Sequence, residues 1–225
     1  MSLHALTLFE VNRVKYIIMC GWNEPTQPKH LQKFNDETII ERTIRLLREN
    51  GVTDIAISSN HPAFEGFGVP VLHHANTYPE GCWLEAFFPT DEPVCYIFGD
   101  VIFSGHAIRK IVQNETTSVQ FFASAPPFAE GYSKRWAEPF AFKVADQKAF
   151  RDAINRATEL GSKGAFKRGP IAWELWQVYK GTPLNEIDYT NYCIINDWTC
   201  DCDYEGEMEQ ILGVLDAAFG NHSVL

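Results

Sequence analysis

The sequence lacks the features that would place a protein in or across a membrane. No apolar stretch reaches the ~18 residues that a membrane span requires. The N-terminus has no charged segment, long apolar core and small-residue cleavage site of the kind found in secretory leaders. We therefore expect a soluble protein of the cytoplasm with no membrane partner.

The sequence also has no block of five or more basic residues. Its 19 Lys and Arg stand against 29 Asp and Glu, which gives a formal net charge of −10. This balance argues against nucleic acid as the main partner, because binding to a phosphate backbone depends on clustered cations. A nucleotide stays compatible with it, since a few local cations, backbone amides and a divalent ion can compensate one polyphosphate.

Paired cysteines of a metal-binding or disulfide-bonded type are missing as well. The six cysteines lie at positions 20, 82, 95, 193, 200 and 202, a spacing typical of free thiols in a reducing compartment. Cys200 and Cys202 are separated by one residue and have no second pair, which disfavours a structural zinc site. No internal repeat or linker divides the chain, so we expect one α/β domain over residues 1–225.

One apolar run, Val94 to Ser104, contains a carboxylate that needs an explanation. The run is rich in β-branched and aromatic residues, which predicts a strand buried on both faces, but Gly99 and Asp100 interrupt it. Because an unpaired carboxylate is costly to bury, we expect the strand to end at Gly99 and to place Asp100 at the edge of the sheet. Two interpretations are open for Asp100: a metal ligand, or a turn residue that caps the following helix.

The elements around this run predict an α/β fold. Residues 14–19 and 54–59 are predicted strands, and a helix between them over 39–48 has Thr38 as its N-cap, which makes a βαβ unit. Further strands are predicted over 69–72, 118–124, 139–144 and 192–195. Further helices are predicted from about 80–83 and over 104–113, 147–160, 171–179 and 204–219.

Three groups of residues are expected at the edge where the parallel strands end. They are the loop from Gly21 to Lys29, Asp100, and the pair Asp201 and Asp203. A Gly-containing backbone can approach a phosphate closely, lysine supplies a mobile positive charge, and paired carboxylates can hold a hard cation such as Mg²⁺. Plainer interpretations are a solvated lysine beside a turn and, for the aspartates, negative charge at the start of the last helix.

Two other clusters are interpreted as structural. Adjacent histidines on a strand point to opposite faces, so His73 and His74 are expected in a loop or at the surface rather than as a metal pair. Trp173, Trp176 and Tyr179 lie at helical spacing, which favours a buried or dimer-facing stripe over an aromatic ligand box.

Several segments, in order and spacing, resemble the nucleotidyltransferases that make nucleotide-diphospho-sugars and related activated head groups. They are residues 17–21, 28–31, 38–44, 50–55 and 98–104, which cover the first half of the chain. The resemblance resumes at Asp201-Cys-Asp203-Tyr-Glu, which is similar to the family's Asp-x-Asp-Thr-Pro-Glu-Asp segment.

This resemblance implies a three-layer α/β/α sandwich with a mixed, mostly parallel, Rossmann-like sheet. The implied reaction is Mg²⁺-dependent transfer of a nucleotidyl group from a nucleoside triphosphate to a small phosphorylated sugar or alcohol-type acceptor, with release of pyrophosphate. The residues that match the family's positions are Lys29 for phosphate binding, Asp100 and Asp203 with Asp201 for the metal, Cys20, Gly21 and Gly81 for the nucleotide, and Glu138 for the acceptor.

The chain departs from the family in the loop that should bind the triphosphate. Family members carry a Gly-x-Gly-x-Arg sequence, whereas Gly21-Trp-Asn-Glu-Pro-Thr-Gln-Pro28 has one glycine and no arginine. Glu24 within it would repel phosphates unless it faces away. Two further interpretations therefore stand beside the enzyme: a binding or regulatory domain that has lost catalysis, and a glycosyltransferase that uses a nucleotide-sugar.

Overall fold

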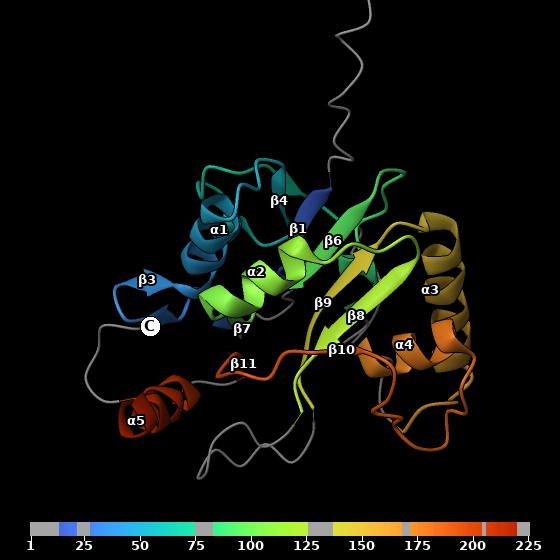
Figure 1. Cartoon of the computed structure of the whole chain (residues 1–225). Helices are drawn as coiled ribbons and strands as arrows, with labels where there is room; N and C mark the ends of the chain where they lie inside the picture. Colours follow the sequence, from blue (N-terminus) through green and yellow to red (C-terminus); the bar gives the residue numbers. More distant parts are fainter. Residues whose placement is uncertain are drawn as a thin grey trace, which may run out of the picture.

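A computed structural model describes residues 14–21, 28–74, 83–125, 137–167, 172–203 and 206–219. Its centre is a seven-stranded sheet in the order β10-β8-β9-β6-β1-β4-β5 (Figure 1). The strands are β1 (Lys15–Met19), β4 (Ile55–Ser58), β5 (Val71–Leu72), β6 (Val94–Phe98), β8 (Val119–Ala123), β9 (Pro139–Val144) and β10 (Cys193–Ile194). Only β9 runs against its neighbours β6 and β8, while the remaining pairs are parallel.

The two faces of the sheet are covered by different helices because side chains alternate along each strand. Tyr16 and Ile18 of β1 belong to the core cluster that includes the buried faces of α1 (Ile39–Glu49) and α2 (Gly105–Gln113). Ile17 and Met19 belong to the cluster on the other face, with α3 (Gln147–Ser162) and α4 (Ala172–Lys180). This is the three-layer α/β/α arrangement that the sequence predicted, with a mixed and mostly parallel sheet.

The helices begin at residues whose side chains satisfy free backbone N–H groups. Thr38 accepts a hydrogen bond from the backbone N–H of Glu41, whose carboxylate in turn accepts from the Thr38 N–H, a complete capping box at the start of α1. Ser104 caps α2 in the same position by accepting from the N–H of Ala107. The predicted N-cap of α1 is thereby confirmed.

A third, smaller cluster lies at the carboxyl edge of the sheet. It joins the hairpin of β2 (Lys33–Phe34) and β3 (Glu37–Thr38) to the antiparallel pair β7 (Val101–Ile102) and β11 (Cys200–Asp201) and to α5 (Glu207–Phe219). Neither short pair of strands was predicted from the sequence.

The other predicted elements are present, and none of their ends is shifted by more than three residues. The exception is the helix predicted from about residues 80–83, because the described part of that segment is a 3₁₀ turn, Trp83–Ala86. It is followed by Phe87 and Pro89, and a proline soon after a turn prevents its extension into a longer helix. Within the described residues, no helix is both long enough and apolar enough to span a membrane.

Candidate active site

The strand order reverses between β1 and β6, which is where open α/β sheets form a crevice for ligands. The chain leaves β1 toward β4 on one side, and β6 pairs with β1 on the other. Met19 lies opposite Phe98 in the register, so Gly21 and Asp100 come from the carboxyl ends of adjacent parallel strands. The position predicted for Asp100 is therefore confirmed.

The ends of β1 and β6 approach each other too closely for a side chain between them. The N–H of Gly99 donates to the carbonyl of Met19 over 3.0 Å. A Cβ atom at position 99 would lie 2.5 Å from that carbonyl oxygen and 2.7 Å from the sulfur of Cys20. Glycine is thus required here for close approach rather than for backbone conformation, and the turn that it permits delivers Asp100 to the crevice.

Lys29 joins two carboxylates at this edge. Its Nζ lies 2.6 Å from Oδ2 of Asp100 and 2.9 Å from Oδ1 of Asp203. Lys29 and Asp100 are largely buried, with 9% and 13% of their side chains exposed, whereas Asp203 is 45% exposed. The structure therefore brings together three of the residues that the sequence predicted for phosphate and metal binding.

The pairing of β7 with β11 places the C-terminal aspartates beside Asp100. Asp201 lies opposite Val101 in the register, and the N–H of Cys202 donates to the carbonyl of Asp100 over 2.8 Å. The backbone N–H of Asp203 donates to the carboxylate of Glu207, which is buried in the first turn of α5. A short strand pair thus fixes the second half of the site against the first.

The charges at this edge hold Lys29 and Asp100 in their ionised forms. Burial lowers the pKa of Lys29, but the negative charges of Asp100 and Asp203 and their hydrogen bonds outweigh it, so the pKa is raised above its ordinary value. Burial raises the pKa of Asp100, but the positive charge of Lys29 outweighs it and leaves the pKa lowered. At neutral pH the site contains an ammonium group and a carboxylate rather than a neutral pair.

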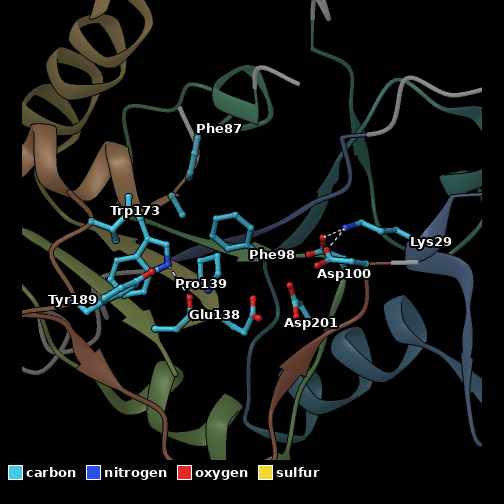
Figure 2. A pocket seen from close by; sticks show the side chains of 13 residues that line it. Lys29, Phe87, Phe98, Asp100, Glu138, Pro139, Trp173, Tyr189 and Asp201 are labelled. Atoms are coloured by element: carbon cyan, nitrogen blue, oxygen red, sulfur yellow. Dashed lines mark hydrogen bonds and ion pairs between the residues drawn. The ribbon is translucent and has the colours of Figure 1, made fainter. Parts of the chain in front are cut away.

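A cavity of about 400 Å³ opens beside this cluster (Figure 2). The charged side chains that line it are Lys29, Asp100, Glu138, Asp201 and Asp203. The apolar and aromatic residues that line it are Phe87, Phe98, Ala137, Pro139, Ala172, Trp173, Ile187 and Tyr189. In the view of Figure 2, Glu138 and Asp201 lie between the aromatic pair Trp173 and Tyr189 and the ion pair of Lys29 with Asp100.

The oxygen donors at this edge fit a small divalent cation. Among the described residues, no group of three or more His, Cys, Asp or Glu side chains is arranged to hold a metal ion. Mg²⁺ does not require such a group, because it commonly keeps several waters and binds one or two carboxylates together with substrate phosphates. Asp100 and Asp203 already have carboxylate oxygens within 3 Å of one positive centre, the Nζ of Lys29. The pair can therefore surround a cation between them.

The other sequence-predicted residues have separate positions. Asp100 does not cap the following helix, since Ser104 does. Glu138 lines the cavity, and its role in binding the acceptor stays a prediction. Cys20 is fully buried with its thiol behind Gly99, and its predicted nucleotide contact stays a prediction. Gly81 and residues 22–27 of the phosphate loop lie outside the described residues.

Sequence reasoning missed most of the aromatic wall. Trp173 was interpreted as part of a buried stripe, and its side chain is indeed buried against Phe121, but it also lines the cavity. Phe98 is the last residue of β6, and Tyr189 comes from an irregular segment with no periodic pattern. The turn at Gly99 was the available signal for Phe98, because the last residue of a strand borders the crevice.

Comparison with known proteins identifies the fold. No family model matches the sequence, and no curated protein sequence matches it. Solved structures do match. A protein of Bacillus anthracis assigned as a glucose-1-phosphate thymidylyltransferase is similar with a TM-score of 0.58 and 17% identity, over 93% of this chain and 96% of that one.

Two cytidylyltransferases give similar results. The 2-C-methyl-D-erythritol 4-phosphate cytidylyltransferase of Thermus thermophilus matches with a TM-score of 0.56 and 13% identity, over 92% of this chain and 98% of that one. The CTP:phosphocholine cytidylyltransferase of Streptococcus pneumoniae matches with a TM-score of 0.50 and 15% identity, over 90% of this chain and 99% of that one. At the level of the fold, the resemblance seen in the sequence is confirmed: the chain has the fold of the nucleotide-diphospho-sugar transferases.

Proposed function

We propose that the protein is a Mg²⁺-dependent nucleotidyltransferase that moves a nucleoside monophosphate from a nucleoside triphosphate to a small phosphorylated acceptor and releases pyrophosphate. The observation that carries the proposal is the Lys29 ammonium in contact with Asp100 and Asp203 at the point where the strand order reverses. The fold shared with two cytidylyltransferases and a protein assigned as a thymidylyltransferase supports it.

The reaction needs little acid–base chemistry from the protein. An oxygen of the acceptor's phosphate, already ionised at neutral pH, attacks the α-phosphorus of the triphosphate, and the bond to the pyrophosphate oxygen breaks. Catalysis then depends on holding the two groups in line and on neutralising the charge that moves to pyrophosphate. Mg²⁺, when bound by Asp100 and Asp203, supplies part of that neutralisation.

Lys29 supplies the other part. Its raised pKa keeps it protonated throughout the neutral range, so it acts as a fixed positive charge and not as a proton donor. The flexible side chain of Lys29 contacts two carboxylates, so one of these contacts can be replaced by a contact to a phosphate oxygen. The ammonium group then still has two negatively charged partners. Glu138 and the apolar wall beside it are left to bind the acceptor.

The proposal is tested by measuring pyrophosphate release with each of the four nucleoside triphosphates, Mg²⁺ and a panel of phosphorylated sugars and alcohols. Turnover of one combination is the expected result. Asp100→Asn should then lower kcat by about 100-fold or more, a typical loss for a group that stabilises transition-state charge. Asp152→Asn is the matched control, because Asp152 lies exposed on α3 and pairs with Lys148. Unchanged turnover in Asp100→Asn would contradict the assigned role.

The sequence of the phosphate loop favours a second candidate, a nucleotide-binding domain without catalysis. One glycine and no arginine between Gly21 and Pro28 leave fewer groups to hold a triphosphate. Thermal unfolding with Mg²⁺ and each triphosphate separates the candidates. A stabilised protein that releases no pyrophosphate with any acceptor supports the binding domain. A protein that no triphosphate stabilises counts against both.

A further inference from the structure

The aspartates that form the second half of the candidate active site lie on a segment with little regular structure of its own. Asp201 is the last residue of β11, which has two residues, and Asp203 follows it. β11 pairs with the equally short β7 in an antiparallel register, with Asp201 opposite Val101 (Figure 1). Strands of this length do not fix their register by themselves, because an isolated pair of strands is at best marginally stable.

Hydrogen bonds bracket this strand pair at both ends. At the end beside Lys29, the N–H of Cys202 donates to the carbonyl of Asp100 over 2.8 Å. At the other end, the N–H of Ser104 donates to the hydroxyl oxygen of Thr199 over 3.0 Å. The first bond lies within the candidate site, whereas the second lies on the far side of the strand pair, at the start of α2.

The carboxylate of Asp197 joins the two residues of the far bond. Its Oδ2 accepts a hydrogen bond from the hydroxyl of Ser104 over 2.6 Å, and its Oδ1 accepts from the backbone N–H of Thr199 over 2.8 Å. Ser104 and Thr199 are 4% and 1% exposed, so little water can replace these bonds. Hydrogen bonds to a carboxylate are also stronger than those between neutral groups. Asp197 thus ties together two residues that are 95 positions apart in the sequence.

This arrangement bears on the site because the register of a strand decides which way its side chains point. A slip of one residue in β11 would turn Asp201 to the opposite face of the strand pair. Asp203 would then also lose its place beside Lys29, whose Nζ it contacts over 2.9 Å. Asp197 itself is not among the described residues that line the cavity there, and it lines a separate cavity beside α1 and α2.

We propose that Asp197 is a positioning residue for the candidate active site. Through Ser104 and Thr199, its carboxylate holds β11 in register with β7 and so fixes the two aspartates of the C-terminal segment beside Asp100. The effect on catalysis rests on the proposed function, because a reacting group displaced by about 1 Å can cost about 100-fold in rate. The effect on register does not rest on it and is measured without turnover. The plain alternative is that Asp197 only stabilises the start of α2.

Hydrogen exchange of single backbone amides, followed by NMR on the full chain, separates these two roles. In Asp197→Ala, we expect the N–H of Cys202 to exchange about tenfold or more faster, because the strand pair opens more often. The N–H of Ala107 should change much less, since the Ser104 hydroxyl still accepts from it. Asp146→Ala, which removes the cap of α3, is the matched control and should leave Cys202 unchanged. An effect at Cys202 that is no larger than the effect at Ala107 overturns the proposal.

Milder changes keep the proposal testable if Asp197→Ala does not fold. Asp197→Asn retains one oxygen acceptor, so we expect a smaller increase in exchange at Cys202. Thr199→Val keeps the shape of the side chain and removes the acceptor for the N–H of Ser104, whereas Thr199→Ser retains a hydroxyl there. Exchange at Cys202 should therefore rise in Thr199→Val and stay near that of the unaltered protein in Thr199→Ser. Equal exchange in the two Thr199 variants overturns the proposal.

Turnover decides whether this register matters for catalysis. We expect Asp197→Ala to lower kcat per folded molecule about tenfold or more, and Asp146→Ala to leave it unchanged. An unchanged kcat in Asp197→Ala, together with faster exchange at Cys202, would show that the site does not depend on this register and would overturn the positioning role. If the unaltered protein turns over no acceptor, the proposed function fails, while the exchange comparison still decides whether Asp197 holds β11 in register.

Discussion

Lys29 and Asp100, which are 71 positions apart in the sequence, form an ion pair of 2.6 Å, and Asp203 near the C-terminal end of the chain also contacts Lys29. The pair depends on the order of strands rather than on local sequence. β1 and β6 must be adjacent and parallel for the lysine after one strand to meet the aspartate after the other. The candidate site is therefore a product of the fold's central strand pair.

Replacement of Lys29 should cost stability as well as activity. Lys29→Met leaves Asp100 in a largely buried position without its nearest positive charge, and we expect a loss of about 3 kcal/mol in the free energy of unfolding. Urea denaturation measures it, with Lys148→Met, a change at an exposed lysine of α3, as the control. The double variant Lys29→Met/Asp100→Asn should be more stable than Lys29→Met alone. A double variant that is less stable would show that the two residues do not interact as an ion pair.

His30 should make the protein sensitive to mild acid. The ring is fully buried next to Lys29 and packs edge to face against Phe64, and burial lowers its pKa from 6.5 to about 4. The unfolded chain takes up this proton near pH 6.5 and the folded chain only near pH 4. Stability from neutral His30 is thus complete above about pH 6.5 and falls as the pH drops toward 4, by about 3 kcal/mol in total.

The measurement is the free energy of unfolding between pH 7 and pH 4. In His30→Gln, which cannot titrate in this range, the decline should be smaller by about that amount. An identical slope in His30→Gln and the unaltered protein would contradict the prediction.

A side chain at position 99 should disturb both the core and the site. In Gly99→Ala the new Cβ would meet the carbonyl of Met19 and the sulfur of Cys20, and backbone cannot move aside as a flexible side chain can. We expect the free energy of unfolding to fall by about 2 kcal/mol because the added methyl group overpacks this position. Activity should fall as well, because Asp100 must move with its neighbour.

Gly105→Ala is the matched control for this change. A Cβ at position 105 would have its nearest contact 3.8 Å away, at a methyl group of Leu46, and the residue lies in the first turn of α2. Alanine there should stabilise the protein by about 0.5 kcal/mol. Thermal unfolding of the two variants should therefore shift in opposite directions, and a shift in the same direction would contradict the close approach seen at Gly99.

Local sequence patterns predicted those helices, strands and turns that are determined by residues only a few positions apart. The apolar run in residues 14–19, the capping residue Thr38 and the break at Gly99 each act within a few positions, and the strand, helix and turn that they predicted are present. The position of Asp100 followed from them. The expected strand ends placed Lys29 and Asp203 at the same edge, and the resemblance to nucleotidyltransferases gave each its expected role, although no periodicity joins the two residues across 174 positions.

The parts that could not be predicted depend on contacts between distant and irregular segments. The pairing of β7 with β11 is two residues long in each strand and joins segments about 100 positions apart, so it leaves no pattern in the sequence. Tyr189 reaches the cavity from a segment without regular structure. Trp173 has the helical spacing of a core residue because it is one, and its second role at the cavity wall appears only when β9 and α4 are placed side by side.

A buried lysine away from the site should be as important for stability as the lysine within it. Lys143 of β9 is 6% exposed, and its ammonium donates to the backbone carbonyls of Ile111, Val112 and Asn114 at the end of α2, over 3.1, 2.9 and 2.5 Å. These carbonyls lie at the end of the helix, where no following turn supplies N–H groups to bond with them. The positive charge of Lys143 also interacts favourably with the negative end of the helix dipole. Burial lowers the pKa of Lys143, and the three hydrogen bonds to backbone carbonyls stabilise its ammonium group in this buried position.

Lys143→Met removes the donor and leaves an apolar chain of similar length against three carbonyl oxygens. We expect a loss of about 3 kcal/mol in the free energy of unfolding, because buried acceptors without a donor are costly. Hydrogen exchange should show faster opening of α2 than of α1, since only α2 loses its C-terminal contacts. Turnover per folded molecule should stay near that of the unaltered protein, because Lys143 does not line the cavity. If Lys143→Met were as stable as the exposed control Lys148→Met, the lysine would have no structural role at the end of α2.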